Sequence, residues 1–198
     1  MRLFIAVYPS AEALDDLSRL VRTLAVSRAA ERGVNARVIR RPLWHVTAAF
    51  LGDVDEQRLP RVHAALDAAV AADGTGAQPP TLAVGGGGRF GRGRFTLLWA
   101  GLRGEVPQLS ALASRARREL RRARVRYDEK PFRPHLTIAR PGDRISAEAI
   151  AEDIATLDRY HGPRWSADQI HLVRSTLGPH PVHETIAAWS VTGARAGD

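Results

Sequence analysis

Hydrophobic positions along the chain follow two spacings, one typical of strands and one typical of helices. Residues 3–7 form a short unbroken apolar run, which predicts a buried strand that Pro9 and Ser10 end. After Ser10, leucines and valines recur at every third or fourth position, so we expect Ser10 to cap an amphipathic helix. The same spacing predicts further helices near residues 56–70, 106–124 and 147–157.

Short β-rich segments lie between and after these helices. They are residues 37–40, 45–50, 81–84, 95–100, 135–138, 170–173 and 185–191. Strands joined by hairpin-length connections and interspersed with helices indicate an α+β fold with largely antiparallel sheets. The chain has 198 residues, enough for one sizeable core, and we treat it as a single domain.

The chain also contains an internal similarity at an offset of 90 residues. Five identical pairs share this offset, namely His45 and His135, Thr47 and Thr137, Gly52 and Gly142, Asp53 and Asp143, and Trp99 and Trp189. The order of predicted elements repeats as well: a strand carrying His-x-Thr, a Gly-Asp turn, a helix and two strands. The sequence therefore predicts two copies of one unit, about 45–100 and 135–190, which form two lobes related by a pseudo-two-fold axis within one domain, 1–198.

Composition adds information about partners and compartment. The formal net charge of +8 favours anionic partners, nucleic acid first among them. Lys130 is the only lysine among the 29 basic residues, so the arginine excess is equally compatible with a biased codon supply. The chain contains no cysteine, which excludes disulfides, thiolate metal sites and cysteine nucleophiles. No apolar run is long enough for a signal peptide or a membrane span, and we expect a cytoplasmic protein.

The repeated His-x-Thr motif is the main candidate for chemistry. Residues two apart in a strand point to the same face, so His45 and Thr47 project together, as do His135 and Thr137. If the two strands face each other, one imidazole can accept a proton from water while the opposing imidazolium protonates a leaving oxygen. The threonine hydroxyls can donate to phosphate oxygens. A single motif would fit an ordinary buried histidine, but two at corresponding positions favour a catalytic pair.

The segments around these motifs resemble those of the 2H phosphoesterases. They read W-H-V-T-A-A-F-L-G-D-V over residues 44–54 and F-R-P-H-L-T-I-A-R over residues 132–140. The branch indicated is that of the bacterial and archaeal RNA 2′,3′-cyclic phosphodiesterases, also called 2′-5′ RNA ligases. The resemblance covers almost the whole chain.

This resemblance implies a bilobal α+β fold with a central cleft and a reaction that needs no metal and no other cofactor. The reaction would convert a terminal 2′,3′-cyclic phosphate into a 2′-phosphate. The resemblance makes His45 the proton donor and His135 the proton acceptor, with Thr47 and Thr137 binding the phosphate and Arg140 supporting it. We expect a monomer that acts on RNA ends or on small cyclic phosphodiesters, without a membrane partner.

Two other functions are compatible with the same sequence. The protein could bind a terminal phosphate without turning it over, which the basic charge would suit equally well. It could also join RNA ends through a 2′-5′ bond, which is chemically the reverse of the hydrolytic step. Two matched titratable groups favour an enzyme over a binding module, because binding alone does not require them.

Two arginine-containing segments lie outside the motifs. Residues 85–94 contain a G-x-G-x-x-G match, but a strand is predicted after it and not a helix, so we reject a dinucleotide site and expect a flexible hairpin loop or an RNA-contacting arm that includes Phe90. Seven arginines between residues 115 and 126 predict either a solvated helix face or a landing surface for phosphates.

The remaining histidines lie outside the two His-x-Thr motifs. His180 and His183 have a spacing that a metal could use, but the chain offers no cysteine and no carboxylate in register with them, and we reject a metal site there. His183 stands where the family often has a tyrosine, which puts a base-stacking role at that position in question. We interpret His63, His161 and His171 as structural or surface residues.

Overall fold

Two antiparallel sheets and five α-helices make up the computed structural model, which describes residues 1–71, 78–178 and 181–191. One sheet has the strand order β3-β1-β8-β9 and the other the order β2-β6-β5-β4-β7. The strands are β1 (Arg2–Val7), β2 (Arg37–Val38), β3 (Val46–Asp53), β4 (Thr81–Phe90), β5 (Leu97–Gly104), β6 (Leu136–Arg140), β7 (His161–Ser166), β8 (Gln169–Thr176) and β9 (Val182–Ser190). The helices are α1 (Ala11–Thr23), α2 (Ala25–Glu31), α3 (Leu59–Ala71), α4 (Val106–Arg122) and α5 (Ala147–Arg159), with 3-10 turns η1 (Arg41–Leu43), η2 (Glu56–Arg58) and η3 (Gly93–Phe95).

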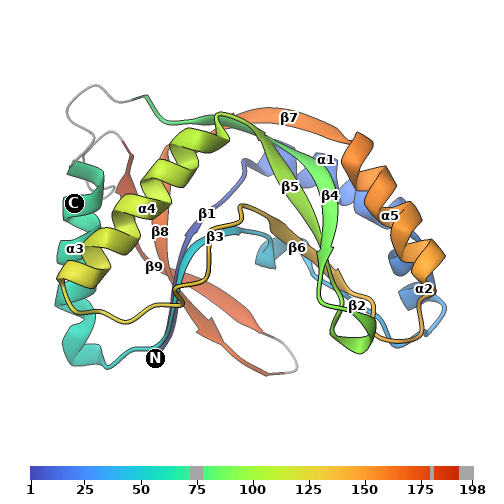
Figure 1. The fold of residues 1–198 in the computed structure, drawn as a ribbon, viewed down its shortest axis with the longest axis horizontal. Helices are drawn as coiled ribbons and strands as arrows, with labels where there is room; N and C mark the ends of the chain where they lie inside the picture. Colours follow the sequence, from blue (N-terminus) through green and yellow to red (C-terminus); the bar gives the residue numbers. More distant parts are fainter. Residues whose placement is uncertain (72–77, 179–180, 192–198) are drawn as a thin grey trace.

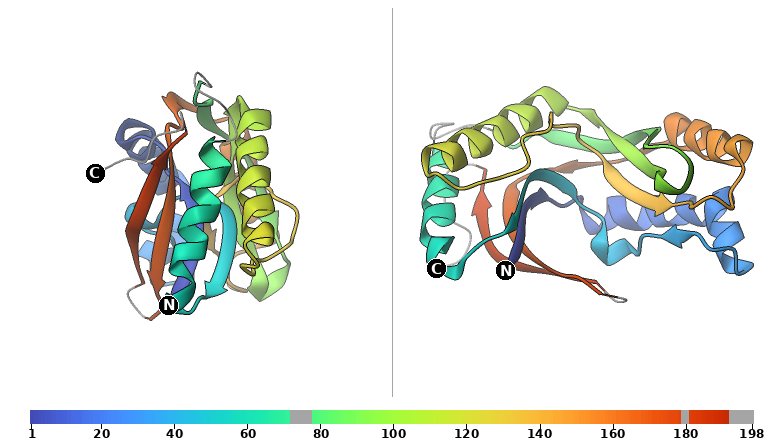
Figure 2. Two further views of the ribbon diagram at one scale, coloured as in Figure 1. Left: turned by 90° about the vertical axis from the view of Figure 1, so that its left-hand side faces the viewer. Right: turned by 60° about the horizontal axis from the view of Figure 1, so that its bottom comes forward.

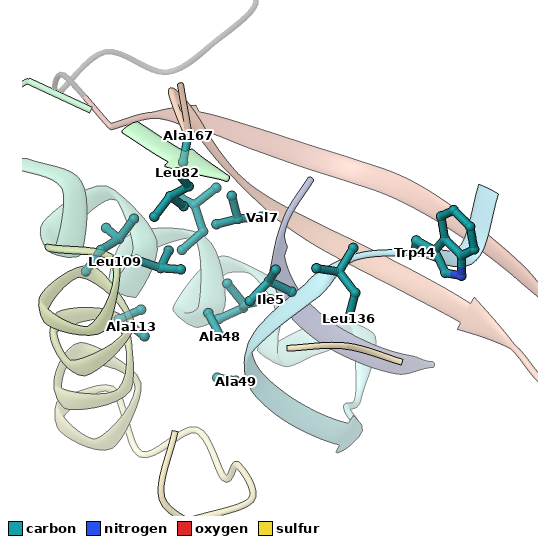
Figure 3. Close-up of a cluster of buried hydrophobic side chains, with 14 of the residues drawn as sticks. Ile5, Val7, Trp44, Ala48, Ala49, Leu82, Leu109, Ala113, Leu136 and Ala167 are labelled. Carbon is teal, nitrogen blue, oxygen red and sulfur yellow. The ribbon is translucent and has the colours of Figure 1, made fainter. Parts of the chain in front are cut away.

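The helices gather at the two ends of the molecule, with the sheets between them (Figure 1). Helices α3 and α4 pack side by side at one end, and α1, α2 and α5 lie at the other, as the right-hand view of Figure 2 also shows. Buried side chains from both sheets belong to one continuous hydrophobic cluster, in which Ile5 and Leu82 are fully buried (Figure 3). The α+β class with antiparallel sheets is therefore confirmed.

Amphipathic spacing correctly located the helices that carry local signals. Helix α1 begins after Ser10, whose hydroxyl accepts a hydrogen bond from the backbone N–H of Ala13 at 3.2 Å. Ser146 caps α5 in the same way, through the N–H of Ala149. Helix α2 and strand β7 were not predicted from the sequence, and β4 and β5 are longer than expected.

Helix α2 was missed because its N-terminal cap comes from a distant part of the chain. Its N-cap residue, Leu24, has no side-chain oxygen to offer the exposed N–H groups of the first turn. The carboxylate of Asp153 on α5 accepts instead, from Ala25 N at 2.6 Å and from Val26 N at 3.0 Å. Asp153 is buried, so this contact joins α2 to α5 inside the protein.

Replacing Asp153 by alanine should destabilise the protein by about 2–5 kcal/mol, since the buried N–H of Val26 and the part-buried N–H of Ala25 lose their acceptor. The free energy of unfolding, measured by urea denaturation, checks this expectation. Glu152→Ala is the matched control, because Glu152 is the preceding, exposed residue of the same helix. Equal stability of the Asp153→Ala variant and the wild type would contradict the capping role.

The glycine run 85–88 is strand, so the expectation of a flexible loop over 85–94 is wrong for its first half. Strand β4 continues to Phe90, and the connection to β5 contains only the short turn around η3. Close packing explains the glycines: a Cβ on Gly87 would collide with the carbonyl oxygen of Ile154 on α5, and one on Gly88 would collide with the ring of Trp99. Because these glycines have no side chain, α5 packs directly on β4 at Gly87, and the ring of Trp99 from the neighbouring strand lies against Gly88.

The two His-x-Thr strands lie in different sheets, β3 at an edge and β6 between two neighbours. Strand β3 pairs with β1, and β6 pairs with β5 and β2. Each strand has a register shift just after its motif, at Ala48 in β3 and at Ile138 in β6. Trp99 and Trp189 lie on strands with different neighbours, because β5 is central in its sheet and β9 is at an edge. The 90-residue repeat as a whole stays a prediction.

Candidate active site

His45 lies between η1 and β3, at the start of the first His-x-Thr strand. Its Nδ1 atom is 2.7 Å from the carbonyl oxygen of Leu43, two residues earlier. Because a carbonyl only accepts, Nδ1 carries the proton and Nε2 is left for other partners. The ring of Phe4 stacks on the imidazole with a centroid distance of 4.6 Å. Backbone and aromatic contacts together fix the orientation of this ring.

His135 is held by the same device at the start of β6. Its Nδ1 lies 2.6 Å from the carbonyl oxygen of Arg133, again two residues earlier. The ring of Phe90 meets it edge-on at 4.9 Å, and that of Trp99 lies 6.3 Å away. Both histidines of the repeated motif therefore present Nε2 as the available nitrogen.

Alternation along β3 and β6 separates the site residues from the core. Val46 and Leu136 are buried in the hydrophobic cluster, whereas Thr47 and Thr137 are half-buried on the opposite face, as predicted. Thr47 from the first motif and His135 from the second line the same pocket, and the charge of His135 acts on His45. The structure thus brings the two motifs together.

Arg140 lies apart from this group. It is exposed at the end of β6, opposite Arg37 of β2, and it does not line the pocket that contains Thr47 and His135. Arg140 lies two residues after the register shift at Ile138 in β6, as Phe50 lies two residues after the register shift at Ala48 in β3. Of these two residues, Phe50 lines the pocket and Arg140 does not. A role for Arg140 in supporting the phosphate stays a prediction.

The pocket shared by the two motifs has a volume of about 390 Å³. It is lined by Thr47, Phe50, Phe90, Arg117, Asp128, Lys130, Pro131, Phe132, Arg133 and His135. Aromatic rings and cations surround a polar end at Thr47 and His135. Such a lining suits an anion that is attached to a flat apolar group.

Two further histidines reach the site from β8 and β9. The ring of His183 meets His45 edge-on at 5.0 Å, and that of His171 meets Tyr8 edge-on at 5.1 Å. Tyr8 is itself 6.1 Å from His45. The contact of His171 with Tyr8 is compatible with the structural role expected for it, and the contact of His183 with His45 shows that this position lies beside the first motif. No local sequence signal marks His171 and His183 as neighbours of the site, because their approach depends on the pairing of β1 with β8.

No group of three or more histidine, cysteine, aspartate or glutamate side chains among the described residues could hold a metal ion. His183 contacts His45 and Phe4. His180, its suggested metal-binding partner, lies outside the described residues.

The environment shifts the protonation of both motif histidines in the same direction. Loss of water around the ring lowers the pKa of His45 to about 4, the bond to Leu43 opposes this, and the charges of His183 and His135 lower it further. Burial also lowers the pKa of His135. Both shifts disfavour the imidazolium form. A bound phosphate anion would favour the protonated form of either ring.

The arginines of residues 115–126 are largely engaged within the protein. Arg117 donates to the carbonyl oxygens of Ala48 at 2.9 Å and of Lys130 at 2.8 Å. Arg122 pairs with the carboxylate of Glu119 at 2.9 Å, and Arg121 donates to the hydroxyl of Tyr127 at 2.9 Å. The contacts of Arg117 and Arg121 tie α4 to neighbouring segments, whereas the Arg122 pair lies within α4. Arg121 and Arg122 are exposed, as a solvated helix face would be.

If the threonines hold phosphate oxygens, Thr47→Ala and Thr137→Ala should each lower kcat/KM for a cyclic phosphodiester by roughly 2- to 10-fold. The loss is modest because each change removes one neutral hydrogen-bond donor. Steady-state kinetics with Thr47→Ser and Thr137→Ser as controls check this, since serine keeps the hydroxyl. Serine variants as impaired as the alanine variants would contradict the hydroxyl's role.

Comparisons with known proteins identify the family of this chain. The model of the 2′-5′ RNA ligase superfamily matches residues 8–179. An RNA 2′,3′-cyclic phosphodiesterase of Geobacillus stearothermophilus is 33% identical over 159 residues, which are 78% of this chain and 47% of the relative. One of Archaeoglobus fulgidus is 30% identical over 141 residues, 71% of this chain and 72% of the relative. The chain thus spans about half the length of the first of these relatives.

Solved structures share the fold over nearly the whole chain. The Thermus thermophilus protein TT0787 superposes with a TM-score of 0.69 at 25% identity, covering 98% of this chain and 99% of that one. E. coli LigT in complex with ATP has a TM-score of 0.68 at 21% identity and covers 96% of each chain. No helix in the described part of this chain is long and apolar enough to cross a membrane. With a family match over most of its length and a shared fold, this chain belongs to the 2′-5′ RNA ligase superfamily.

Proposed function

We propose that this protein is an RNA 2′,3′-cyclic phosphodiesterase that opens a terminal cyclic phosphate to a 2′-phosphate. One observation carries the proposal: both motif histidines have Nδ1 fixed by a backbone carbonyl, the charge of His135 acts on His45, and Thr47 of the first motif lines one pocket with His135. Two positioned imidazoles match a reaction that needs one proton removed and one delivered. The names of the two curated relatives support the same activity.

In the proposed reaction, Nε2 of His135 accepts a proton from water as its oxygen attacks phosphorus. The bond between phosphorus and O3′ breaks, and O3′ takes a proton from Nε2 of a protonated His45. The product carries a 2′-phosphate and a 3′-hydroxyl, His135 ends protonated and His45 neutral, and exchange with solvent resets both. Thr47 and Thr137 would donate to the non-bridging oxygens. We further propose that no metal takes part and that Arg140, although outside the pocket lining, supports the phosphate.

The low pKa of His45 is a condition on this mechanism. A general acid must be protonated before the leaving group departs, and the empty site disfavours that state. The substrate's own negative charge offsets the desolvation, so the acid is loaded when the phosphate binds. His135, with its pKa also lowered, is ready to act as a base without further change.

The decisive experiment incubates the protein with an oligoribonucleotide that ends in a 2′,3′-cyclic phosphate. The expected product is the linear 2′-monophosphate, formed at an unchanged rate in the presence of a chelator. An unchanged oligonucleotide that stays bound would identify a binding module. Joining to an added 5′-hydroxyl oligonucleotide, without hydrolysis, would identify a ligase.

A further inference from the structure

The sheet that carries the second His-x-Thr strand has one face buried in the core and the other turned away from it. Along β5, Leu98 belongs to the hydrophobic cluster, so Trp99 and Arg103 lie on the opposite face by strand alternation. Trp99 pairs with Thr137 of the second motif, and its ring lies 6.3 Å from that of His135. This outer face therefore begins at the candidate active site and continues along β5 to Arg103.

Two arginines flank β4 at the far end of this outer face. Ala83 of β4 pairs with Arg103 of β5 on one side and with Arg164 of β7 on the other, so the three side chains share one face. The three strands lie side by side in Figure 1. Neighbouring strands are about 4.8 Å apart, which places the two arginine backbones roughly 10 Å apart with only a methyl group between them. A cavity of about 520 Å³ lies here, lined by both arginines and by Ala83.

Neither guanidinium forms an ion pair with a carboxylate in the described part of the chain. Arg164 is exposed and has no hydrogen bond or ion pair among these residues. Arg103 donates from Nη2 to the carbonyl oxygen of Asp158 at 2.8 Å, which orients the side chain and leaves its charge unpaired. The carboxylate of Glu105 also lines the cavity, but it accepts from the backbone N–H of Thr81 at 2.6 Å. An anion between the two arginines would offset their repulsion and accept charge-assisted hydrogen bonds from both.

The distance between the candidate active site and this cavity is that of a short stretch of RNA. Trp99 and Arg103 are four residues apart in β5, which is about 14 Å at about 3.4 Å per residue. Stacked nucleotides also rise about 3.4 Å each, so a phosphate at the cavity would lie about four nucleotides from the cyclic end, or fewer in an extended strand. Gly101, between the two residues on the same face, has no side chain that would block this path.

We infer that Arg103 and Arg164 bind a backbone phosphate of the substrate RNA upstream of its cyclic end. The inference rests on the proposed function and deepens it, because it makes an oligoribonucleotide the preferred substrate over a cyclic mononucleotide. His161 also lines the cavity. The binding role is assigned to the two permanently charged guanidinium groups, so His161→Ala should keep the preference for long substrates.

The test compares a dinucleotide with a hexanucleotide, both ending in a 2′,3′-cyclic phosphate. The dinucleotide is too short to reach the cavity, so kcat/KM of the wild type should be roughly 3- to 30-fold higher for the hexanucleotide. This ratio should fall in Arg164→Gln and approach one in Arg103→Gln/Arg164→Gln, with kcat/KM for the dinucleotide unchanged. Arg164→Lys keeps the charge and should keep most of the ratio.

Arg144→Gln is the matched control for the change in net charge. The side chain of Arg144 is 75% exposed and lies outside the cavity, so this variant should keep the ratio of the wild type. The salt dependence gives a second readout, because each phosphate contact to a single strand contributes about 0.7 to the slope of log kcat/KM against log salt concentration. For the hexanucleotide, the slope should be shallower by roughly 0.7 in the double variant than in the wild type. For the dinucleotide, the two slopes should be equal.

The outcomes separate this inference from the proposed function. Equal kcat/KM of the wild type for both lengths would overturn the second phosphate site and leave the phosphodiesterase intact. A ratio unchanged in the double variant, or lowered as much in Arg144→Gln, would also overturn it, because net charge and not this cavity would then attract the RNA. Hydrolysis of neither oligonucleotide would reject the proposed function itself. Fluorescence anisotropy of a labelled hexanucleotide still tests the site in that case, and an equal Kd for the wild type and the double variant would overturn it.

Discussion

His45→Ala and His135→Ala should each reduce kcat/KM for cyclic-phosphate hydrolysis by roughly 10²–10⁴. Each imidazole is expected to transfer one proton in the transition state, and alanine can transfer none. Steady-state kinetics on the same oligonucleotide measure the loss. Combined in one protein, the two changes should cost less than the product of the single losses, because groups that act as a unit are not additive.

His161→Ala is the matched control for both variants. The Nδ1 atom of His161 lies 3.0 Å from the carbonyl oxygen of Arg159, the same local arrangement two residues apart, but the residue is exposed on β7. This control should keep full activity, and all three variants should unfold at temperatures close to that of the wild type. Activity within a few-fold of wild type in either His45→Ala or His135→Ala would contradict the acid–base pair.

The second large effect concerns pH. The productive free enzyme has a proton on His45, whose pKa is lowered to about 4, and none on His135, whose pKa is also lowered below its ordinary value of 6.5. A bell-shaped profile of kcat/KM reports the free enzyme, so its optimum should lie below pH 6.5. Above the upper pKa the protonated acid becomes scarcer, and kcat/KM should fall about tenfold per pH unit.

The profile of kcat should have its optimum at higher pH than that of kcat/KM, because the bound anion stabilises the imidazolium. Initial rates measured at saturating and at low substrate concentration between pH 4 and pH 9 separate the two profiles. A kcat/KM that is level from pH 6.5 to pH 8.5 would show that the free site does not hold its histidines in the neutral form.

The elements that the sequence predicted are those whose signals are local. Helices α1 and α5 have serine caps directly before them, and their apolar stripes repeat every three or four residues. Helix α2 lacked such a signal, because Asp153 supplies its cap from 128 residues away. The glycines of β4 looked like a loop because glycine is frequent in loops. In the structure they leave the space that Trp99 and α5 occupy, because a Cβ at these positions would collide with them.

The site residues also divide into those that the local sequence predicted and those that depend on tertiary structure. His45, Thr47, His135 and Thr137 belong to two copies of one short motif, and their shared face follows from strand alternation. The approach of His183 to His45 depends on the pairing of β9 with β8 and of β8 with β1, which the local sequence does not encode. The lowered pKa of His45 likewise depends on what surrounds the ring after folding.

A change of leaving group tests the division of labour between the two histidines most directly. A ribonucleotide analogue with a phosphodiester to p-nitrophenol needs little protonation of its departing oxygen, but it still needs a base to activate water. We expect this substrate to restore most of the rate to His45→Ala and little to His135→Ala, measured as kcat/KM relative to wild type on each substrate. Equal restoration of both variants, or restoration of His135→Ala alone, would contradict His45 as the acid and His135 as the base.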